Sequence, residues 1–328
     1  MKHPGLILAA ALGLAINSGG LAAAQLPGDP RNPGTASLQP PADAPPIKAN
    51  PPGPYAVTIE ANPSLMSHTI YRPENLDGFT GAKRLPIIAW GNGACSNAGL
   101  LFQNFLTNVS SYGFVIIASG PKDAPLPSFA RGQAPATPPA SPPVRPAMTT
   151  DADMKTAIDW AIAENERQGS PYFHRLDPGK VAVMGQSCGG LQAIVNSADP
   201  RVKTSIVWNS GVFPEGTVRG GTMTATKASL AGIHAPVAYI NGGPADAAHI
   251  NAVDDIARIK GVPVFSGWIN VGHGGTFSHP GGGRFAAVGV AWLNWRLNGD
   301  RQAARMFEGP GCELCKDPVW HVTKKDMR

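Results

Sequence analysis

Apolar residues along the chain follow two patterns that are typical of strands. Residues 55–61 and 68–71 alternate apolar and polar positions, as a strand with one buried face does. Residues 85–90 and 114–118 are apolar almost without interruption, which is typical of strands that are covered on both faces. Further strands are expected at residues 181–184, 204–208, 236–241 and 263–270.

The segments between these strands favour helices. Residues 151–167 have an amphipathic pattern, and Thr149 or Thr150 can cap the start of this helix. Other helices are expected at residues 97–110, 191–198, 247–259 and 285–297. The alternation of strands and helices predicts an α/β fold: a mostly parallel central sheet with helices on both faces, formed by a single domain.

The N-terminal segment, residues 1–24, is typical of a signal peptide. Lys2 and His3 give a positive start, and residues 6–16 form an apolar run that is too short to span a bilayer. We therefore expect cleavage near Ala24-Gln25, a secreted or periplasmic protein, and no stable membrane insertion after cleavage. A retained membrane anchor is the alternative.

Proline-rich segments divide the rest of the chain. Residues 25–54 are expected to be a disordered leader. Residues 121–147 are interpreted as a long loop within one domain, with a linker between two domains as the alternative. The folded domain would then span residues 55–308, and residues 309–328 would form a C-terminal tail.

The composition is that of a globular protein. With 328 residues, of which 43% are hydrophobic, the chain can bury the core of one large domain. The net charge is +5, but the basic residues are scattered and do not interleave with aromatic residues. This distribution argues against a nucleic-acid partner.

The interpretation of the four cysteines depends on the expected export of the protein. An oxidising compartment permits disulfides, and four cysteines allow three connectivities. Cys312 and Cys315 are near enough in sequence to pair, which would leave Cys95 with Cys188. Separate buried thiols at Cys95 and Cys188 are the alternative. The Cys-x-x-Cys of the tail follows no strand and has no second ligand pair, so a redox motif or a zinc site is disfavoured.

The strongest candidate for chemistry is the run Gly185-Gln186-Ser187-Cys188-Gly189. It stands between an apolar strand and a helical segment, so the order is strand, tight turn, helix. A serine at the tip of such a turn exposes its hydroxyl to a base, and the flanking glycines let the backbone bend sharply. The sequence therefore predicts Ser187 as a nucleophile.

A serine nucleophile needs a base, and His273 is the best placed histidine. It follows the last predicted strand directly and stands between glycines. His279 is the reserve candidate. His68 lies in an early strand, and His234 and His249 lie before a strand and within a helix. A solvent-exposed loop histidine is the alternative for His273.

The base needs a carboxylate to orient it, and Asp246 is the candidate. It follows the predicted strand at residues 236–241, just before a helix. Asp254 and Asp255 compete for the role but lie further along that helix. A helix cap is the structural alternative for Asp246.

When a serine attacks a carbonyl group, the carbonyl oxygen becomes an oxyanion, and backbone N–H groups commonly stabilise it by donating hydrogen bonds. The amide of Cys188 is the first candidate, because Cys188 follows the nucleophile. The second is expected in the loop after the strand at residues 85–90, where Asn92 is favoured and Gly93 and Ala94 are alternatives. A Cys95–Cys188 disulfide would tie the two halves of this site together.

The substrate pocket is the least defined part. Trp208 and Asn209 follow a strand on the catalytic side and are candidates to line the pocket, although packing in the core is the favoured alternative for Trp208. Phe277 follows His273 closely and is expected to flank the site.

Together these motifs resemble the α/β-hydrolase superfamily over roughly residues 55–308. The chain is similar to the branch of dienelactone-hydrolase-like enzymes, chlorophyllase-like esterases and bacterial polyester hydrolases. The resemblance rests on the serine motif at residues 185–190, the Trp90-Gly91-Asn92-Gly93 turn, residues 243–246 and Gly272-His273-Gly274. Dienelactone hydrolases carry cysteine as the nucleophile, and polyester hydrolases commonly have an aromatic residue where this chain has Gln186.

The resemblance implies hydrolysis of carboxylic esters through an acyl-enzyme, with no metal and no organic cofactor. The expected partner is a small-molecule or polymeric ester, with the polyester less favoured. A serine peptidase or acyltransferase with the same triad is one alternative. A non-catalytic exported binding protein on a hydrolase scaffold is the other.

Overall fold

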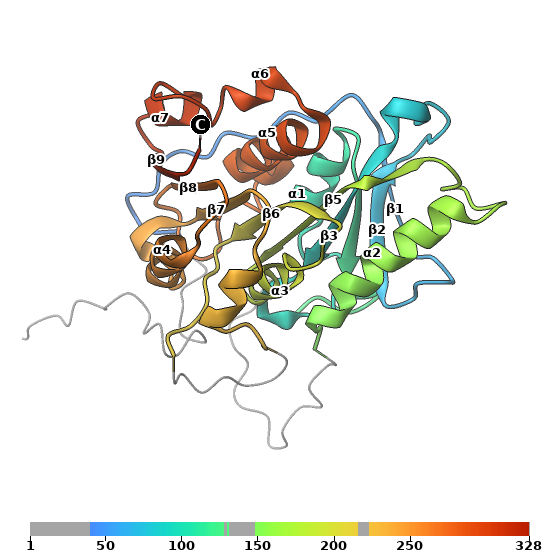
Figure 1. The fold of residues 1–328 in the computed structure, drawn as a ribbon, viewed down its shortest axis with the longest axis horizontal. Helices are drawn as coiled ribbons and strands as arrows, with labels where there is room; N and C mark the ends of the chain where they lie inside the picture. Colours follow the sequence, from blue (N-terminus) through green and yellow to red (C-terminus); the bar gives the residue numbers. More distant parts are fainter. Residues whose placement is uncertain (1–39, 128–129, 131–147, 216–222, 328) are drawn as a thin grey trace, which may run out of the picture.

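The computed structural model describes residues 40–127, 130, 148–215 and 223–327 of the chain. Within them lies one sheet in the strand order β1-β2-β4-β3-β5-β6-β7-β8-β9 (Figure 1). The strands from β4 to β8 in that order pair in parallel, whereas β1, β2 and β9 pair antiparallel with their neighbours. The strands are β1 (Val57–Glu60), β2 (His68–Pro73), β3 (Leu85–Gly91), β4 (Val115–Ser119), β5 (Leu176–Gln186), β6 (Val202–Trp208), β7 (Val237–Asn241), β8 (Val264–Trp268) and β9 (His321–Lys325).

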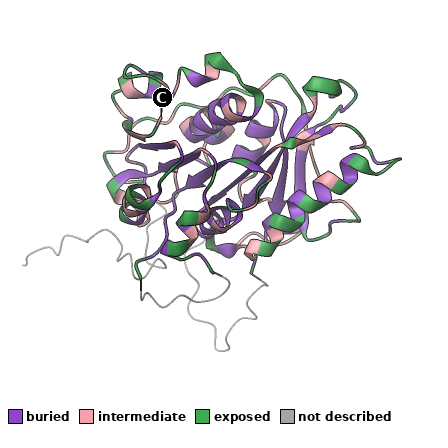
Figure 2. Ribbon diagram, viewed as in Figure 1, coloured by how far each residue is buried: buried purple, intermediate pink, exposed green. Residues whose placement is uncertain are grey.

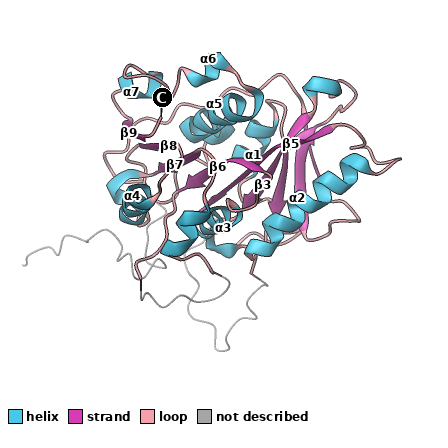
Figure 3. Cartoon of the chain, viewed as in Figure 1, coloured by secondary structure: helices cyan, strands magenta, loops and turns pink. Residues whose placement is uncertain are grey.

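Helices connect these strands and cover both faces of the sheet (Figure 3). The α-helices are α1 (Gln103–Ser110), α2 (Asp151–Glu166), α3 (Cys188–Asn196), α4 (His249–Arg258), α5 (Gly283–Asn298), α6 (Arg301–Ala304) and α7 (Glu313–Lys316). The 3-10 helices are η2 (Gly81–Lys83), η3 (Gly93–Cys95), η5 (Lys227–Gly232), η6 (Gly243–Ala245) and η7 (Pro280–Gly282). The prediction of an α/β fold with a mostly parallel sheet is confirmed.

The core lies in two layers, because successive side chains of a strand point to opposite faces. Ile88 of β3 packs in one cluster with Phe105 of α1 and Trp292 of α5. Its neighbour Ile87 packs in another cluster with Met154 of α2. The central strands are therefore buried on both sides, as Figure 2 shows, in agreement with their nearly continuous apolar sequence.

The proline-rich leader is partly ordered against this body. Asn50 Nδ2 donates to Asn108 Oδ1 at 2.7 Å, and the backbone N–H of Gly53 donates to Ser111 Oγ at 2.7 Å. The prediction of disorder is therefore wrong for residues 40–54, where these bonds to α1 and the turn after it compensate for weak hydrophobicity. The signal peptide, residues 25–39 and most of the loop at residues 121–147 lie outside the described residues.

The C-terminal segment is part of the sheet rather than a tail. Its strand β9 pairs antiparallel with β8, with Thr323 opposite Ser266. The buried ring of Trp320 contributes to the core cluster beneath α5. The predicted boundary at residue 308 is therefore wrong, because the sheet continues to residue 325.

Backbones approach closely where β3, β5 and α3 meet, and glycine makes this possible. A Cβ atom built on Gly189 would lie 1.9 Å from the carbonyl oxygen of Gly91. A Cβ atom on Gly185 would lie 2.4 Å from the backbone of Gly189. Because the obstructing atoms are backbone, no side-chain rearrangement can make room, so the start of α3 can lie this close to both strands only without side chains.

We expect Gly189→Ala to lower the free energy of unfolding by about 1–3 kcal/mol, because the added methyl group collides with Gly91. Gly78→Ala is the matched control, since a Cβ atom there meets nothing within 4 Å. The control should change stability by less than about 0.5 kcal/mol. Denaturant unfolding of both variants measures the difference, and equal midpoints would contradict the packing argument.

Candidate active site

Ser187 stands in a strained turn between β5, which ends at Gln186, and α3, which begins at Cys188. Its φ of 55° lies in the left-handed region, which is unfavourable for a residue with a side chain. Its backbone is held in place: its N–H donates to the carbonyl of Trp208 at 3.0 Å, and its carbonyl accepts from Ser210 Oγ at 2.7 Å. The predicted turn at the C-terminal end of a central strand is thus present.

Three side chains from three loops meet in a hydrogen-bonded line. His273 Nε2 lies 3.0 Å from Ser187 Oγ, and His273 Nδ1 lies 2.6 Å from Asp246 Oδ1. Asp246 follows β7 and His273 follows β8, so both loops leave the same edge of the sheet as Ser187. The structure therefore brings the three predicted residues together in the order Ser, His, Asp.

The carboxylate of Asp246 is buried and fully engaged. Besides His273, it accepts hydrogen bonds from the backbone N–H groups of Ala248 at 2.9 Å and Gly242 at 3.1 Å, and from Asn209 Nδ2 at 2.8 Å. Burial alone would raise the pKa of Asp246, but the hydrogen bond and charge of His273, with the two backbone donors, outweigh it and lower the pKa. Asp246 is therefore an anion that fixes the imidazole orientation.

The competing acids have other partners. Asp255 is buried beside Lys227, whose Nζ lies 2.6 Å from it, and it accepts from the backbone N–H of Val212 at 2.7 Å. Burial raises the pKa of Asp255 to about 6 against the opposing effect of Lys227. Asp254 pairs with Lys227 and Arg258. Their contacts support the loop after β6 and the surface of α4 rather than the histidine.

The other histidines also have separate contacts. His68 is buried, and its Nε2 lies 2.9 Å from the carbonyl oxygen of Asp153. His249 Nδ1 lies 2.9 Å from Asn241 Oδ1, and burial lowers the pKa of His249 against the opposing charge of Asp246. His234 contacts the carbonyl of Val202. His279 ends the loop before η7.

Two backbone segments face the space above Ser187. Cys188 is the first residue of α3, so its N–H has no acceptor within the helix and can serve a ligand. Gly93, Ala94 and Cys95 line the cavity at Ser187, whereas Asn92 does not. The favoured choice of Asn92 is thus less well placed than the alternatives Gly93 and Ala94.

Asn92 has a structural function instead. Its Nδ2 donates to the carbonyl oxygens of Ser96, Ala98 and Ser119 at 2.7–3.1 Å, and its Oδ1 accepts from Trp90 Nε1 at 2.9 Å. These bonds fold the loop that carries the candidate oxyanion donors.

The cysteines pair as Cys95–Cys188 and Cys312–Cys315, so the predicted connectivity is confirmed. The first pair joins η3 to the start of α3 and lies in the wall of the cavity at Ser187. Both segments with candidate oxyanion donors are therefore covalently linked. The second pair closes a short turn within the C-terminal segment.

The cavity beside Ser187 has a volume of about 470 Å³ and a mostly apolar wall. Its apolar side chains include Leu101, Phe102, Met148, Leu191, Phe213 and Met223, and its polar ones include Asn209, Ser210 and Asn251. Asn209, which the sequence predicts as a pocket residue, lies in the wall of this cavity. Trp208 and Phe277 do not line it, because both rings pack in the aromatic cluster around Phe105.

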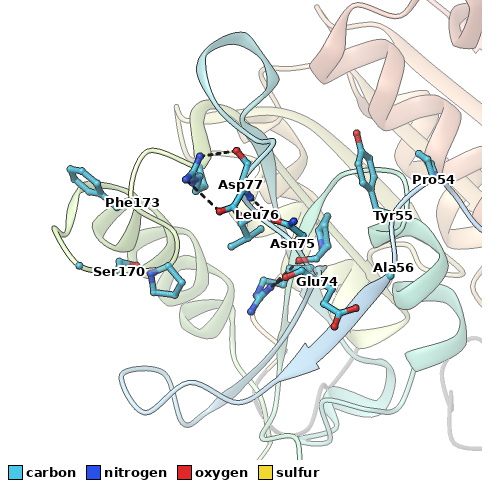
Figure 4. Close-up of a pocket in the computed structure, with 14 residues that line it drawn as sticks. Pro54, Tyr55, Ala56, Glu74, Asn75, Leu76, Asp77, Ser170 and Phe173 are labelled. Atoms are coloured by element: carbon cyan, nitrogen blue, oxygen red, sulfur yellow. Dashed lines mark hydrogen bonds and ion pairs between the residues drawn. The ribbon is translucent and has the colours of Figure 1, made fainter.

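A larger cavity, of about 820 Å³, lies at the opposite edge of the sheet, between the end of β2 and the segment before β5 (Figure 4). Its polar groups contact one another: Arg175 donates to the carbonyl of Asp77 at 3.1 Å, and Arg72 donates to that of Glu74 at 2.8 Å. It contains none of the three aligned residues, so size alone does not identify the site.

Gln186 and Ser210 were not predicted as site residues. Gln186 Nε2 donates to the carbonyl of His273 at 3.1 Å, and Ser210 Oγ donates to that of Ser187. The position of Gln186 beside the nucleophile was a sequence signal for the first contact. No sequence signal pointed to the second, which depends on how β6 lies against α3.

Comparison with known proteins does not assign a family to the chain, so the interpretation of the site rests on its geometry. No protein-family model matches the chain, and no curated protein matches it. Among the described residues, His, Cys, Asp and Glu do not form a group of three or more that could hold a metal ion. No helix in the described part of the chain is long and apolar enough to cross a membrane.

We expect the variant Cys95→Ser/Cys188→Ser to unfold with a free energy about 4–5 kcal/mol lower than the wild type. This pair is separated by 93 residues, and the entropy that a cross-link removes from the unfolded chain grows with loop length. The matched control Cys312→Ser/Cys315→Ser removes a disulfide between cysteines that are only 3 residues apart. Its free energy of unfolding should fall by about 2 kcal/mol or less. Denaturant unfolding compares them, and recovery of Cys95 and Cys188 as free thiols in non-reducing peptide mapping would contradict the pairing.

Proposed function

We propose that the protein is a serine hydrolase of carboxylic esters with an α/β-hydrolase fold. The observation that carries the proposal is the line from Asp246 through His273 to Ser187, with distances of 2.6 and 3.0 Å, at the wall of an apolar cavity. A serine hydroxyl is a weak nucleophile, and this line supplies the base and the group that orients it. The order of strands and helices also supports this fold assignment.

In the proposed reaction Ser187 Oγ attacks the ester carbonyl carbon while His273 Nε2 takes the hydroxyl proton. The carbonyl oxygen becomes an oxyanion and accepts hydrogen bonds from the N–H of Cys188 and from an N–H of the Gly93–Cys95 turn. The C–O bond to the alcohol then breaks, and the alcohol leaves with the proton from His273. Asp246 stabilises the imidazolium during this step.

The acyl group now remains on Ser187 Oγ. Water attacks its carbonyl carbon while His273 accepts a proton from the water. The second tetrahedral intermediate releases the carboxylic acid as the proton returns to Ser187 Oγ. The cycle needs no redox partner, and its atoms balance as ester plus water giving acid plus alcohol.

The cavity favours esters with an apolar group next to the carbonyl. Side chains such as Phe102, Leu191 and Phe213 offer hydrophobic contact, and none of the wall residues that the structure describes is Asp, Glu, Lys or Arg. A peptide backbone would need more polar partners along its length than this wall provides, so an ester hydrolase is favoured over a peptidase.

Export is part of the proposal. Two disulfides are typical of proteins in oxidising compartments, and residues 1–24 have the pattern of a signal peptide. We therefore place the activity in the periplasm or outside the cell.

We expect the wild type to hydrolyse p-nitrophenyl esters and Ser187→Ala to lower kcat by about 10⁴-fold or more, because the nucleophile is lost. His273→Ala should lower kcat similarly, whereas the matched control His279→Ala should retain it. The assay is a panel of p-nitrophenyl esters of increasing acyl length, with peptide p-nitroanilides in parallel.

Each outcome has a clear meaning. Absence of wild-type turnover, together with no labelling of Ser187 by an organophosphonate, would overturn the proposal. Faster cleavage of the anilides than of the esters would instead identify a peptidase.

A further inference from the structure

Asn209 contacts the acid of the triad and the loop that carries its base. It follows β6 directly, and its Nδ2 donates to Asp246 Oδ2 at 2.8 Å and to the carbonyl oxygen of Gly272 at 3.1 Å. Gly272 precedes His273, so a single amide group holds both the acid and the loop that carries the base. Both acceptors are oxygens, which fixes the amide orientation with its NH₂ toward them.

The backbone of Asn209 lies in a sparsely populated region, although asparagine adopts it more readily than most residues. Its φ is 42°, in the left-handed region, and its side chain is buried. Among the described residues, its Oδ1 has no hydrogen-bond partner. An unpaired buried acceptor opposes folding, so the contacts that favour this side chain are the two that its Nδ2 makes with Asp246 and Gly272.

The residues on either side of Asn209 also contact the site, through the backbone of Ser187. The carbonyl of Trp208 accepts from the N–H of Ser187, and Ser210 Oγ donates to the carbonyl of Ser187. Trp208 and Ser210 therefore hold the backbone of Ser187, and Asn209, which stands between them, contacts Asp246 and the residue before His273.

We infer that Asn209 is a positioning residue for the proposed hydrolysis, acting through Asp246. Its neutral amide occupies the carboxylate oxygen that does not face His273. This leaves Oδ1 of Asp246 directed at Nδ1 of the imidazole, and it adds no charge that would compete for the proton. The inference rests on the proposed function, because it assigns a task within the same triad.

The first test is Asn209→Gly, since glycine adopts the left-handed region without strain and lacks only the side chain. We expect kcat for a p-nitrophenyl ester to fall about 10- to 100-fold with little change in KM, because the imidazole is less well aligned. His174→Gly is the matched control: it has a φ of 57°, lies before β5 far from the triad, and should leave kcat unchanged.

A double-mutant cycle separates positioning from general structural support. In the Asp246→Ala background, Asn209→Gly should lower kcat by less than about 3-fold, because its partner is already absent. A purely structural role would lower kcat by the same factor in both backgrounds, and that result would overturn the inference. Circular dichroism confirms that each variant compared is folded.

The isosteric variant Asn209→Asp covers the case in which glycine impairs folding. Two buried carboxylates in contact share a proton, so at low pH the new carboxyl group can donate to Asp246 as the amide did. His273 and His249 are the other titratable groups that contact or face Asp246. The ratio of variant to wild-type kcat should therefore decrease as the pH rises, and a constant ratio would contradict the inference.

The wild-type arm distinguishes the two proposals. If the wild type is active and Asn209→Gly is equally active, only the positioning role fails. If the wild type neither hydrolyses esters nor reacts with an organophosphonate at Ser187, the proposed function fails and the positioning role with it.

Discussion

The site depends on a close contact between the backbones of β3, β5 and α3. Gly91, Gly185 and Gly189 lie so near one another that a side chain on any of them would overlap backbone or buried atoms. This contact places the first turn of α3 directly behind the end of β5 and forces Ser187 out at the tip. Because parallel strands end at one edge, Asp246 and His273 then need only short loops to reach it.

The loop opposite Ser187 is held to the same contact by three kinds of bond. The carbonyl of Asn92 accepts from the N–H of Gly189 at 3.0 Å, and the Asn92 amide fixes the loop to itself and to β4. The Cys95–Cys188 disulfide adds a covalent link. The candidate donors on each side therefore cannot move apart independently, which is what the proposed stabilisation of an oxyanion requires.

The residues that the sequence could predict are those whose role follows from position on a strand end. Ser187, Asp246 and His273 each follow an apolar run that predicts a strand. Parallel strands place the residues after their C-terminal ends at the same edge of the sheet. Asn209 also follows a strand, but only the structure shows that its amide faces Asp246. For Asn92 the sequence predicts an oxyanion donor through the backbone N–H, whereas in the structure Gly93 and Ala94 line the cavity and the Asn92 side chain bonds to partners such as Ser119 on another strand.

The segments at both ends of the domain could not be predicted for a different reason. Residues 40–54 have few apolar side chains, and their order comes from individual hydrogen bonds to α1 and the turn after it. Strand β9 is half exposed at the edge of the sheet, so it has neither the apolar run nor the flanking motif of a central strand. Both depend on partners distant in the sequence, which a local pattern does not contain.

Strained backbone conformations are concentrated around the cavity at Ser187. Of the described non-glycine residues with positive φ, Ala94, Cys95, Ser187 and Asn209 lie around the cavity. Each such conformation costs about 1–3 kcal/mol and persists only where other bonds fix it. Here the disulfide fixes Cys95, Trp208 fixes Ser187, and Asp246 fixes Asn209. Folding therefore sets the candidate donors and the line from Asp246 to Ser187 in place, so the proposed reaction would need little reorganisation when charge develops on the substrate.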